Sequence, residues 1–117
     1  MRWAKVTVRS RIKSAQAEIR DGGELLPARA AQLLMELTAL LGNTFEEIRE
    51  ADSAYAHVLL RELESSEHAN RARIRAETSP AYARKREARD TRELVVELIR
   101  SLKYLLRSAE EEMRLTK

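Results

Sequence analysis

The sequence has no cysteine, only three glycines and two prolines, and few aromatic residues. The absence of cysteine excludes disulfide bonds and thiolate metal sites. The scarcity of glycine and proline leaves few positions at which a helix has to end. No stretch approaches the roughly 20 apolar residues that cross a bilayer, and the first nine residues lack the apolar core of a secretory signal. We therefore expect a cytoplasmic protein that makes no contact with a membrane.

Small aliphatic and charged residues dominate instead. Hydrophobic residues occupy 44% of the 117 positions and charged residues 35%, whereas aromatic residues occupy only 4%. Most of the apolar residues are alanine, leucine, isoleucine and valine, the mixture typical of packed helices. This composition predicts an all-α fold, and the length fits a single domain.

Residues 1–43 are expected to form a basic N-terminal segment and two short helices that pack on the rest of the chain. The first helix is predicted over residues 9–20. The second starts at Pro27, because the N–H that proline lacks has no helical partner at a first position. Gly42-Asn43 predicts its end, since glycine adopts the left-handed conformation at little cost.

Residues 44–117 are expected to form a long antiparallel helical hairpin with its turn at 78–80. Thr44 and Glu47 match a capping box, which would start the first arm. Ser79-Pro80 would end that arm and begin the second, because proline disfavours helical geometry in the preceding residue and suits a first helical position. The residues expected to form the coiled-coil-like seam and its oligomer contacts are Tyr55, Leu59, Leu94, Leu98, Leu102 and Leu105.

The apolar stripes of both arms are wider than the two-in-seven seam of a simple coiled coil. A hairpin alone would leave part of each stripe in water. We therefore expect a homo-oligomer.

Charge is segregated along the chain, although the net charge is only +3. Residues 42–67 carry seven acidic and two basic side chains, whereas residues 68–92 carry eight basic and three acidic ones. The basic group includes Arg73 and surrounds the predicted turn as a cationic elbow. Arginine binds phosphate oxygens well, and each neutralised phosphate releases counterions.

The elbow is the best candidate for a functional site. Residues three or four apart share a helical face, so Lys85, Arg89 and Arg92 should form one row, with Arg71 and Arg75 on the preceding helix. The residues expected to contact nucleic acid are Arg71, Arg75, Arg84, Lys85, Arg86, Arg89 and Arg92, together with Arg2, Lys5 and Trp3, whose ring could stack on a base. The same pattern is also typical of solvated helices whose arginines serve solubility and ion pairing, and the sequence leaves both interpretations open.

Catalytic patterns do not accompany these residues. His57 and His68 are eleven positions apart, which is not a spacing that places two metal ligands on one helical face. Gly22-Gly23 lacks the lysine and hydroxyl residue of a phosphate-binding loop. Carboxylate runs such as Glu110-Glu111-Glu112 are typical of solvated helix faces. We expect a protein that is not an enzyme and that binds no cofactor or metal.

Three segments carry a resemblance to known proteins: residues 76–82 (AETSPAY), 98–107 (LIRSLKYLLR) and 110–114 (EEEMR). They resemble small helical proteins of tailed bacteriophages and prophages that are associated with DNA recombination and single-strand annealing. The layout is also distantly similar to the UvsY-type recombination mediators of T-even phages, which are ring-shaped oligomers that bind single-stranded DNA. The resemblance implies an all-helical accessory protein in the host cytoplasm.

Together, these features predict a non-enzymatic accessory protein that binds single-stranded DNA, a recombinase or an annealing protein through the basic elbow. One alternative is an adaptor or inhibitor of a host nucleic-acid-binding enzyme, in which the acidic stretch mimics phosphates or the hairpin fills a groove. Another alternative is a structural or assembly protein of a virion.

Overall fold

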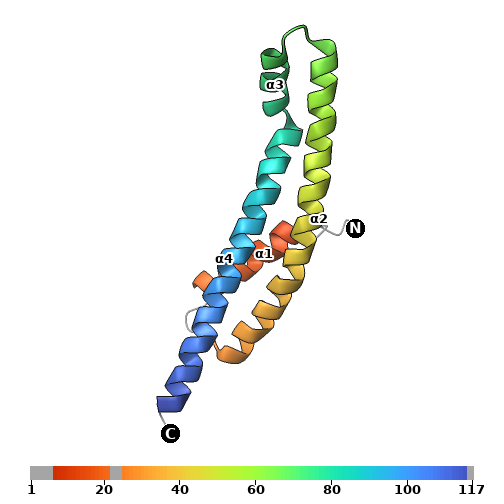
Figure 1. Ribbon diagram of the computed structural model, residues 1–117. Coiled ribbons are helices and arrows are strands. Elements are labelled where there is room, and N and C mark those ends of the chain that lie inside the picture. The colour runs from red at the N-terminus through yellow and green to blue at the C-terminus, as the bar shows by residue number, and fades with distance from the viewer. Residues whose placement is uncertain (1–6, 22–24, 116–117) are drawn as a thin grey trace, which may run out of the picture. The chain divides into compact units, whose positions relative to one another are not determined.

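Two prolines begin the two long helices of the protein. The structure, a computed structural model, describes residues 7–21 and 25–115, and it places α2 at Pro27–Ser65 and α4 at Pro80–Leu115 (Figure 1). Proline suits these positions because a first helical residue has no acceptor for its N–H. Both predicted helix starts are confirmed.

Two shorter helices complete the fold. In α1, Val8–Asp21, the first turn is capped by Thr7, whose Oγ1 accepts the N–H of Ser10 at 3.0 Å. The other, α3, spans Ala69–Glu77. The described residues contain four helices and no strand, which confirms the all-α class.

The chain divides into two compact units. We call the first, Met1–Asn43 with Glu93–Lys117, the leucine unit and the second, Thr44–Arg92, the charged unit.

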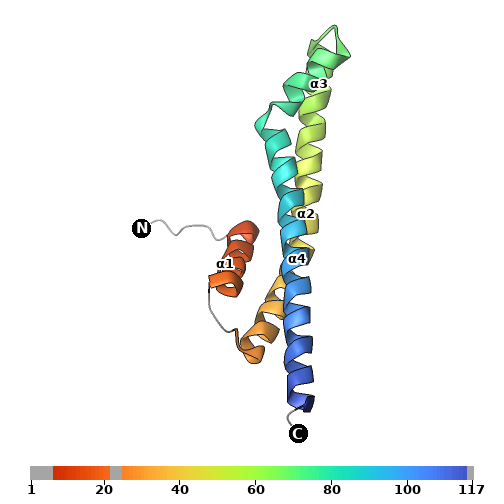
Figure 2. The same cartoon turned by 90° about the vertical axis from the view of Figure 1, so that its left-hand side faces the viewer.

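In the leucine unit, α1 lies alongside the first part of α2 and the second part of α4 (Figure 2). Apolar side chains from all three helices, most of them large, form its core, which comprises Ile12, Ala15, Ala30, Leu33, Leu37, Leu40, Val95, Leu98 and Leu102. Leu94 and Leu105 are partly buried against this cluster. These leucines therefore belong to the core of this unit or pack against it, and the predicted short N-terminal helix is present.

In the charged unit, the second part of α2 packs antiparallel to α3 and the first part of α4. Apart from Tyr55, its buried side chains are smaller, and the full set comprises Thr44, Ala51, Tyr55, Ala72, Ala76, Ala88 and Thr91. Tyr55 is buried as predicted, and Leu59 is partly buried. Alanine at four of these positions is consistent with a close approach of the helices.

The hairpin turn is not at 78–80. It lies at residues 66–68, between α2 and α3 (Figure 1). Cross-hairpin contacts agree with this: Glu62 pairs with Arg75, and Tyr55 stacks with Tyr82, so each pair lies roughly equally far on either side of His68. Ser66 organises the turn, because its Oγ donates to the carbonyl oxygen of His68 at 3.1 Å and accepts the His68 N–H at 3.3 Å.

Ser79-Pro80 forms a joint within one arm. The Oγ of Ser79 donates to the carbonyl oxygen of Ala76 and accepts the N–H of Tyr82, so it closes α3 and caps α4. The predicted helix stop and start are therefore right. The predicted change of direction is wrong, since α3 and the first part of α4 both run back along α2 (Figure 1).

The predicted helix end at Gly42-Asn43 is also wrong, because α2 continues through it. Leu37, Leu40 and Thr44 are buried at three- and four-residue spacing, so the packed face runs through this point without a break. One glycine in a helix costs only about 1 kcal/mol relative to alanine, which this packing offsets. Thr44 is a fully buried residue inside the helix and does not cap one.

None of the described helices is long and apolar enough to span a membrane.

Candidate polyanion-binding surface

The charged unit places its opposite charges on opposite arms. The acidic arm, residues 44–65 of α2, carries six carboxylates and two arginines. The basic arm comprises α3, the joint and residues 80–92 of α4. Between residues 69 and 86 it has six basic side chains and a single carboxylate, Glu77. The basic residues thus form an arm of the hairpin rather than an elbow.

The row predicted from helical spacing is present, but the acidic arm occupies it. The ammonium of Lys85 lies 4.6 Å from the ring centroid of Tyr55. The Nη2 of Arg89 donates to Oδ2 of Asp52 at 2.9 Å. The guanidinium carbon of Arg92 lies 4.9 Å from the ring centroid of Phe45. Each cation of the row therefore already has a partner within the hairpin.

Two looser ion pairs also join the arms. Arg75 lies 4.0 Å from Glu62, and Arg84 lies 3.8 Å from Glu50. The side chains of both arginines are 61% exposed. Pairs that are exposed and this long contribute about 0–1 kcal/mol, so either arginine can exchange its carboxylate for an external anion at little cost.

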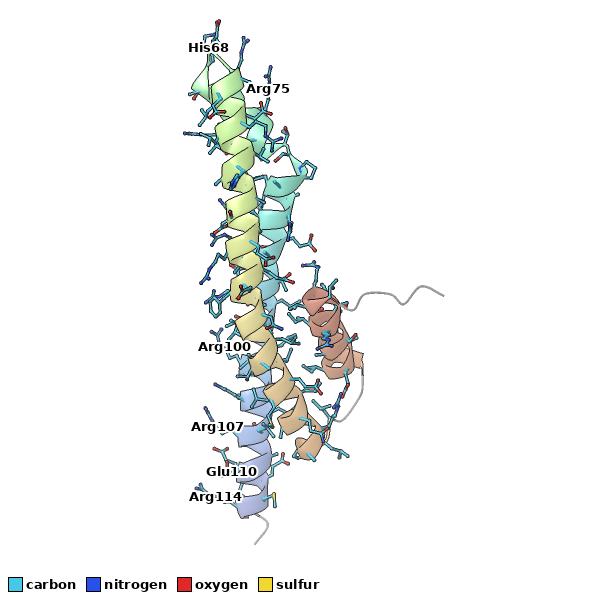
Figure 3. The ribbon with its side chains drawn as sticks, turned by 90° about the vertical axis from the view of Figure 1, so that its right-hand side faces the viewer. His68, Arg75, Arg100, Arg107, Glu110 and Arg114 are labelled. Atoms are coloured by element: carbon cyan, nitrogen blue, oxygen red, sulfur yellow. The ribbon has the colours of Figure 1, made fainter. Side chains whose placement is uncertain are left out.

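Other cations of the basic arm project into solvent. Arg71 and Arg73 are exposed and have no ion pair among the described residues. Arg71 is one helical turn from Arg75, so the two share a face, as predicted. Arg86 is exposed and its guanidinium carbon lies 6.0 Å from the ring centroid of Tyr82. Figure 3 shows Arg75 near the turn of the hairpin, where His68 lies.

Two tyrosines fix the joint against α2. The ring centroids of Tyr55 and Tyr82 are 5.2 Å apart with planes tilted by 48°, a geometry favoured by aromatic pairs. Burial raises the pKa of Tyr55, and the nearby carboxylate of Glu77 acts in the same direction. Tyr55 therefore stays neutral at physiological pH and offers its ring face to Lys85.

Two buried polar atoms in this unit have no hydrogen-bond partner among the described residues: Oδ1 of Asp52 and Nε of Arg92. Both side chains belong to contacts between the arms.

The remaining predicted site residues, Arg2, Trp3 and Lys5, lie outside the described residues. Of the two histidines, His57 has its Nδ1 2.8 Å from the carbonyl oxygen of Ser53, and His68 is at the turn. The described residues contain no group of three or more side chains suited to hold a metal ion.

The leucine unit has an open groove of about 530 Å³ between α1 and α2. A bidentate ion pair lies at its rim, where Nε and Nη2 of Arg29 donate to the carboxylate of Glu18 at 2.5 and 2.8 Å. These bonds lower the pKa of Glu18 and raise the pKa of Arg29. The pair ties α1 to α2.

Sequence reasoning missed Phe45, Asp52 and Glu50 as partners of the basic residues. A signal was present, because Phe45, Asp52 and Tyr55 fall on one flank of a continuous helix. This pattern identifies the partners only if the position of the turn is known, because the turn determines which residues of the two arms face each other.

Comparison of the chain with protein-family models, with curated proteins and with solved structures gives no match in any of the three.

Proposed function

We propose that this protein is a non-enzymatic accessory factor that binds single-stranded DNA through the exposed cations of its basic arm. The observation that carries the proposal is the concentration of exposed arginines on α3 and the start of α4, a stretch in which residues 69–86 contain one carboxylate. The contacting residues would be Arg71, Arg73, Arg75, Arg84 and Arg86.

The mechanism is neutralisation of phosphates without reading of sequence. Exposed guanidinium groups on a helix can each meet a phosphate oxygen and release a counterion. No pocket in the charged unit is needed for this, because the backbone of the nucleic acid is the ligand. The resemblance to phage recombination proteins supports a role beside an annealing or strand-exchange protein.

Fluorescence anisotropy with a labelled oligothymidylate at two salt concentrations tests the proposal. Replacing Arg71, Arg73 and Arg75 by glutamine should weaken binding and reduce the salt slope by about 0.7 for each phosphate that is no longer neutralised. The matched control replaces Arg100, Arg107 and Arg114, which lie on one face of α4 in the leucine unit (Figure 3). Equal weakening in both variants, or no binding at low salt, would refute the proposal.

A second candidate is an adaptor that uses the acidic arm, which carries exposed carboxylates such as Glu46 and Glu64. A basic protein surface would then be the partner. Capture from a host lysate after nuclease treatment distinguishes protein binding from nucleic-acid binding, because a direct protein partner stays bound when the nucleic acid is removed.

Self-association is part of the main proposal. The described residues leave large apolar side chains in solvent, among them Met35 at 75% exposure and Tyr104 at 72%. Binding several copies along one strand would multiply weak contacts. Light scattering at high micromolar concentration tests the proposed self-association. A mass that corresponds to a monomer, both with and without oligonucleotide, would refute it.

A further inference from the structure

The row of Lys85, Arg89 and Arg92 meets an ordered series of groups on α2. Taken in the reverse direction along that helix, these groups are the ring of Tyr55, the carboxylate of Asp52 and the ring of Phe45. A cation row of the basic arm is therefore contacted by two aromatic faces with an anion between them.

That series has the chemistry of a single nucleic-acid strand. Single strands offer the π faces of unstacked bases, which attract cations, and anionic oxygens, which accept from guanidinium groups. Phe45 and Tyr55 supply the first kind of contact, and Asp52 supplies the second. The acidic arm thus satisfies the row as an external strand would.

We propose, on the basis of the function above, that the acidic arm is an internal competitor for single-stranded DNA. In the closed hairpin the acidic arm engages Lys85, Arg89 and Arg92, although the side chain of Arg89 is 54% exposed, so a strand has to displace these contacts to use the row. When the arms of the charged unit separate, Lys85, Arg89 and Arg92 become available, and the open form binds more tightly. The strand and the acidic arm compete for the same cations.

The packing of the charged unit keeps the free energy needed to separate its two arms small. Ala51, Ala72, Ala76 and Ala88 bury little apolar surface compared with leucines, and burial stabilises at roughly 25 cal/mol per Å². Two polar atoms in the contacts are unsatisfied, and the two longer ion pairs are exposed. A ligand that binds the open form has a small difference in free energy to overcome.

Substitution Asp52→Asn tests the competition. It removes the negative charge of the 2.9 Å contact with Arg89 and so weakens that contact. Glu97→Gln is the matched control, because it frees Arg100 from a 2.8 Å contact in the leucine unit with the same change of net charge. We expect Asp52→Asn to tighten oligothymidylate binding about two- to fivefold relative to Glu97→Gln. The slope of the logarithm of the binding constant against the logarithm of the salt concentration should be steeper by about 0.7.

A second variant, Phe45→Leu, removes the ring beneath Arg92 and keeps the site apolar. It should act in the same direction, and circular dichroism checks that both variants stay helical. If the unmodified protein binds and both variants bind no better than Glu97→Gln, the competition is refuted while the proposed function stands. If no protein binds, the proposed function itself fails. If only the variants bind, the competition is supported, but the proposed binding of the unmodified protein through its exposed arginines is refuted.

Discussion

The leucine unit and the charged unit use the same two helices and hold them in different ways. In the leucine unit, Leu33, Leu37 and Leu102 are almost fully buried in a cluster to which three helices contribute. In the charged unit, alanines fill most of the centre, and cation–ring contacts and ion pairs lie along the flank.

This difference in packing indicates that the two units contribute differently to the stability of the fold. Large aliphatic side chains contribute about 1.5–3 kcal/mol each when they are buried, whereas exposed ion pairs contribute about 0–1 kcal/mol. The leucine unit therefore supplies most of the stability. The charged unit keeps many of its arginines near solvent and holds its arms with weaker contacts, as the proposed polyanion-binding surface requires.

The largest expected effect comes from removing a leucine in the leucine unit. Leu37→Ala should lower the free energy of unfolding by about 2–5 kcal/mol, because Leu37 is fully buried and its truncation leaves a cavity in the core. The same substitution at Leu60, which is 56% exposed in the charged unit, should change it by less than about 0.5 kcal/mol. Urea unfolding measures both, and similar decreases would contradict the division of roles.

Enlarging an alanine in the charged unit should have the next largest effect. Ala76 is fully buried where α3 faces α2, so Ala76→Leu should cost about 1–3 kcal/mol through overpacking. The control is Ala83→Leu on the exposed side of α4. If Ala76→Leu is neutral in thermal unfolding, the helices are further apart than the small side chains indicate.

Gly42→Ala tests whether α2 is continuous. The helix passes through Gly42, and a Cβ there meets no atom within 4 Å, so the substitution should raise the free energy of unfolding by about 0.5–1 kcal/mol. A helix that ended at this glycine in a left-handed conformation would be destabilised by alanine. The sign of the change therefore distinguishes the two arrangements.

The smallest effect is the pH dependence of the tie between α1 and α2. Hydrogen bonds from Arg29 lower the pKa of Glu18 below its ordinary 4.5, so the pair stabilises the fold above that value. Its contribution disappears as the pH falls through the lowered pKa. Glu18→Gln should therefore be less stable than the unmodified protein at neutral pH, and the gap should shrink in acid. A gap that is constant with pH would contradict this account; Glu64→Gln is the control for removal of a charge.

The helix starts at Pro27 and Pro80 and the leucine stripes can be predicted from the sequence, because those signals are local. The predicted stop at Gly42 is wrong, since a local breaker does not outweigh a packed face that continues past it. The predicted turn is wrong because Ser66 organises the real one with one hydroxyl, and no glycine or proline marks it.

For the candidate site, composition locates the basic residues and helical spacing predicts their row. Neither can show that Phe45, Asp52 and Tyr55 cover that row, because cross-hairpin contacts depend on the register that the turn sets. Moving the turn from 78–80 to 66–68 changes every facing pair. The sequence therefore indicates which cations matter and not which of them are already engaged.

Native-state hydrogen exchange tests the central claim most directly, because it measures the opening free energy of each segment separately. We predict that amides around Val95 and Leu102 exchange only through global unfolding. Amides of α3 and of α4 near Ala88 should exchange through a local opening with a smaller free energy. Equal opening free energies in the two units would contradict the account.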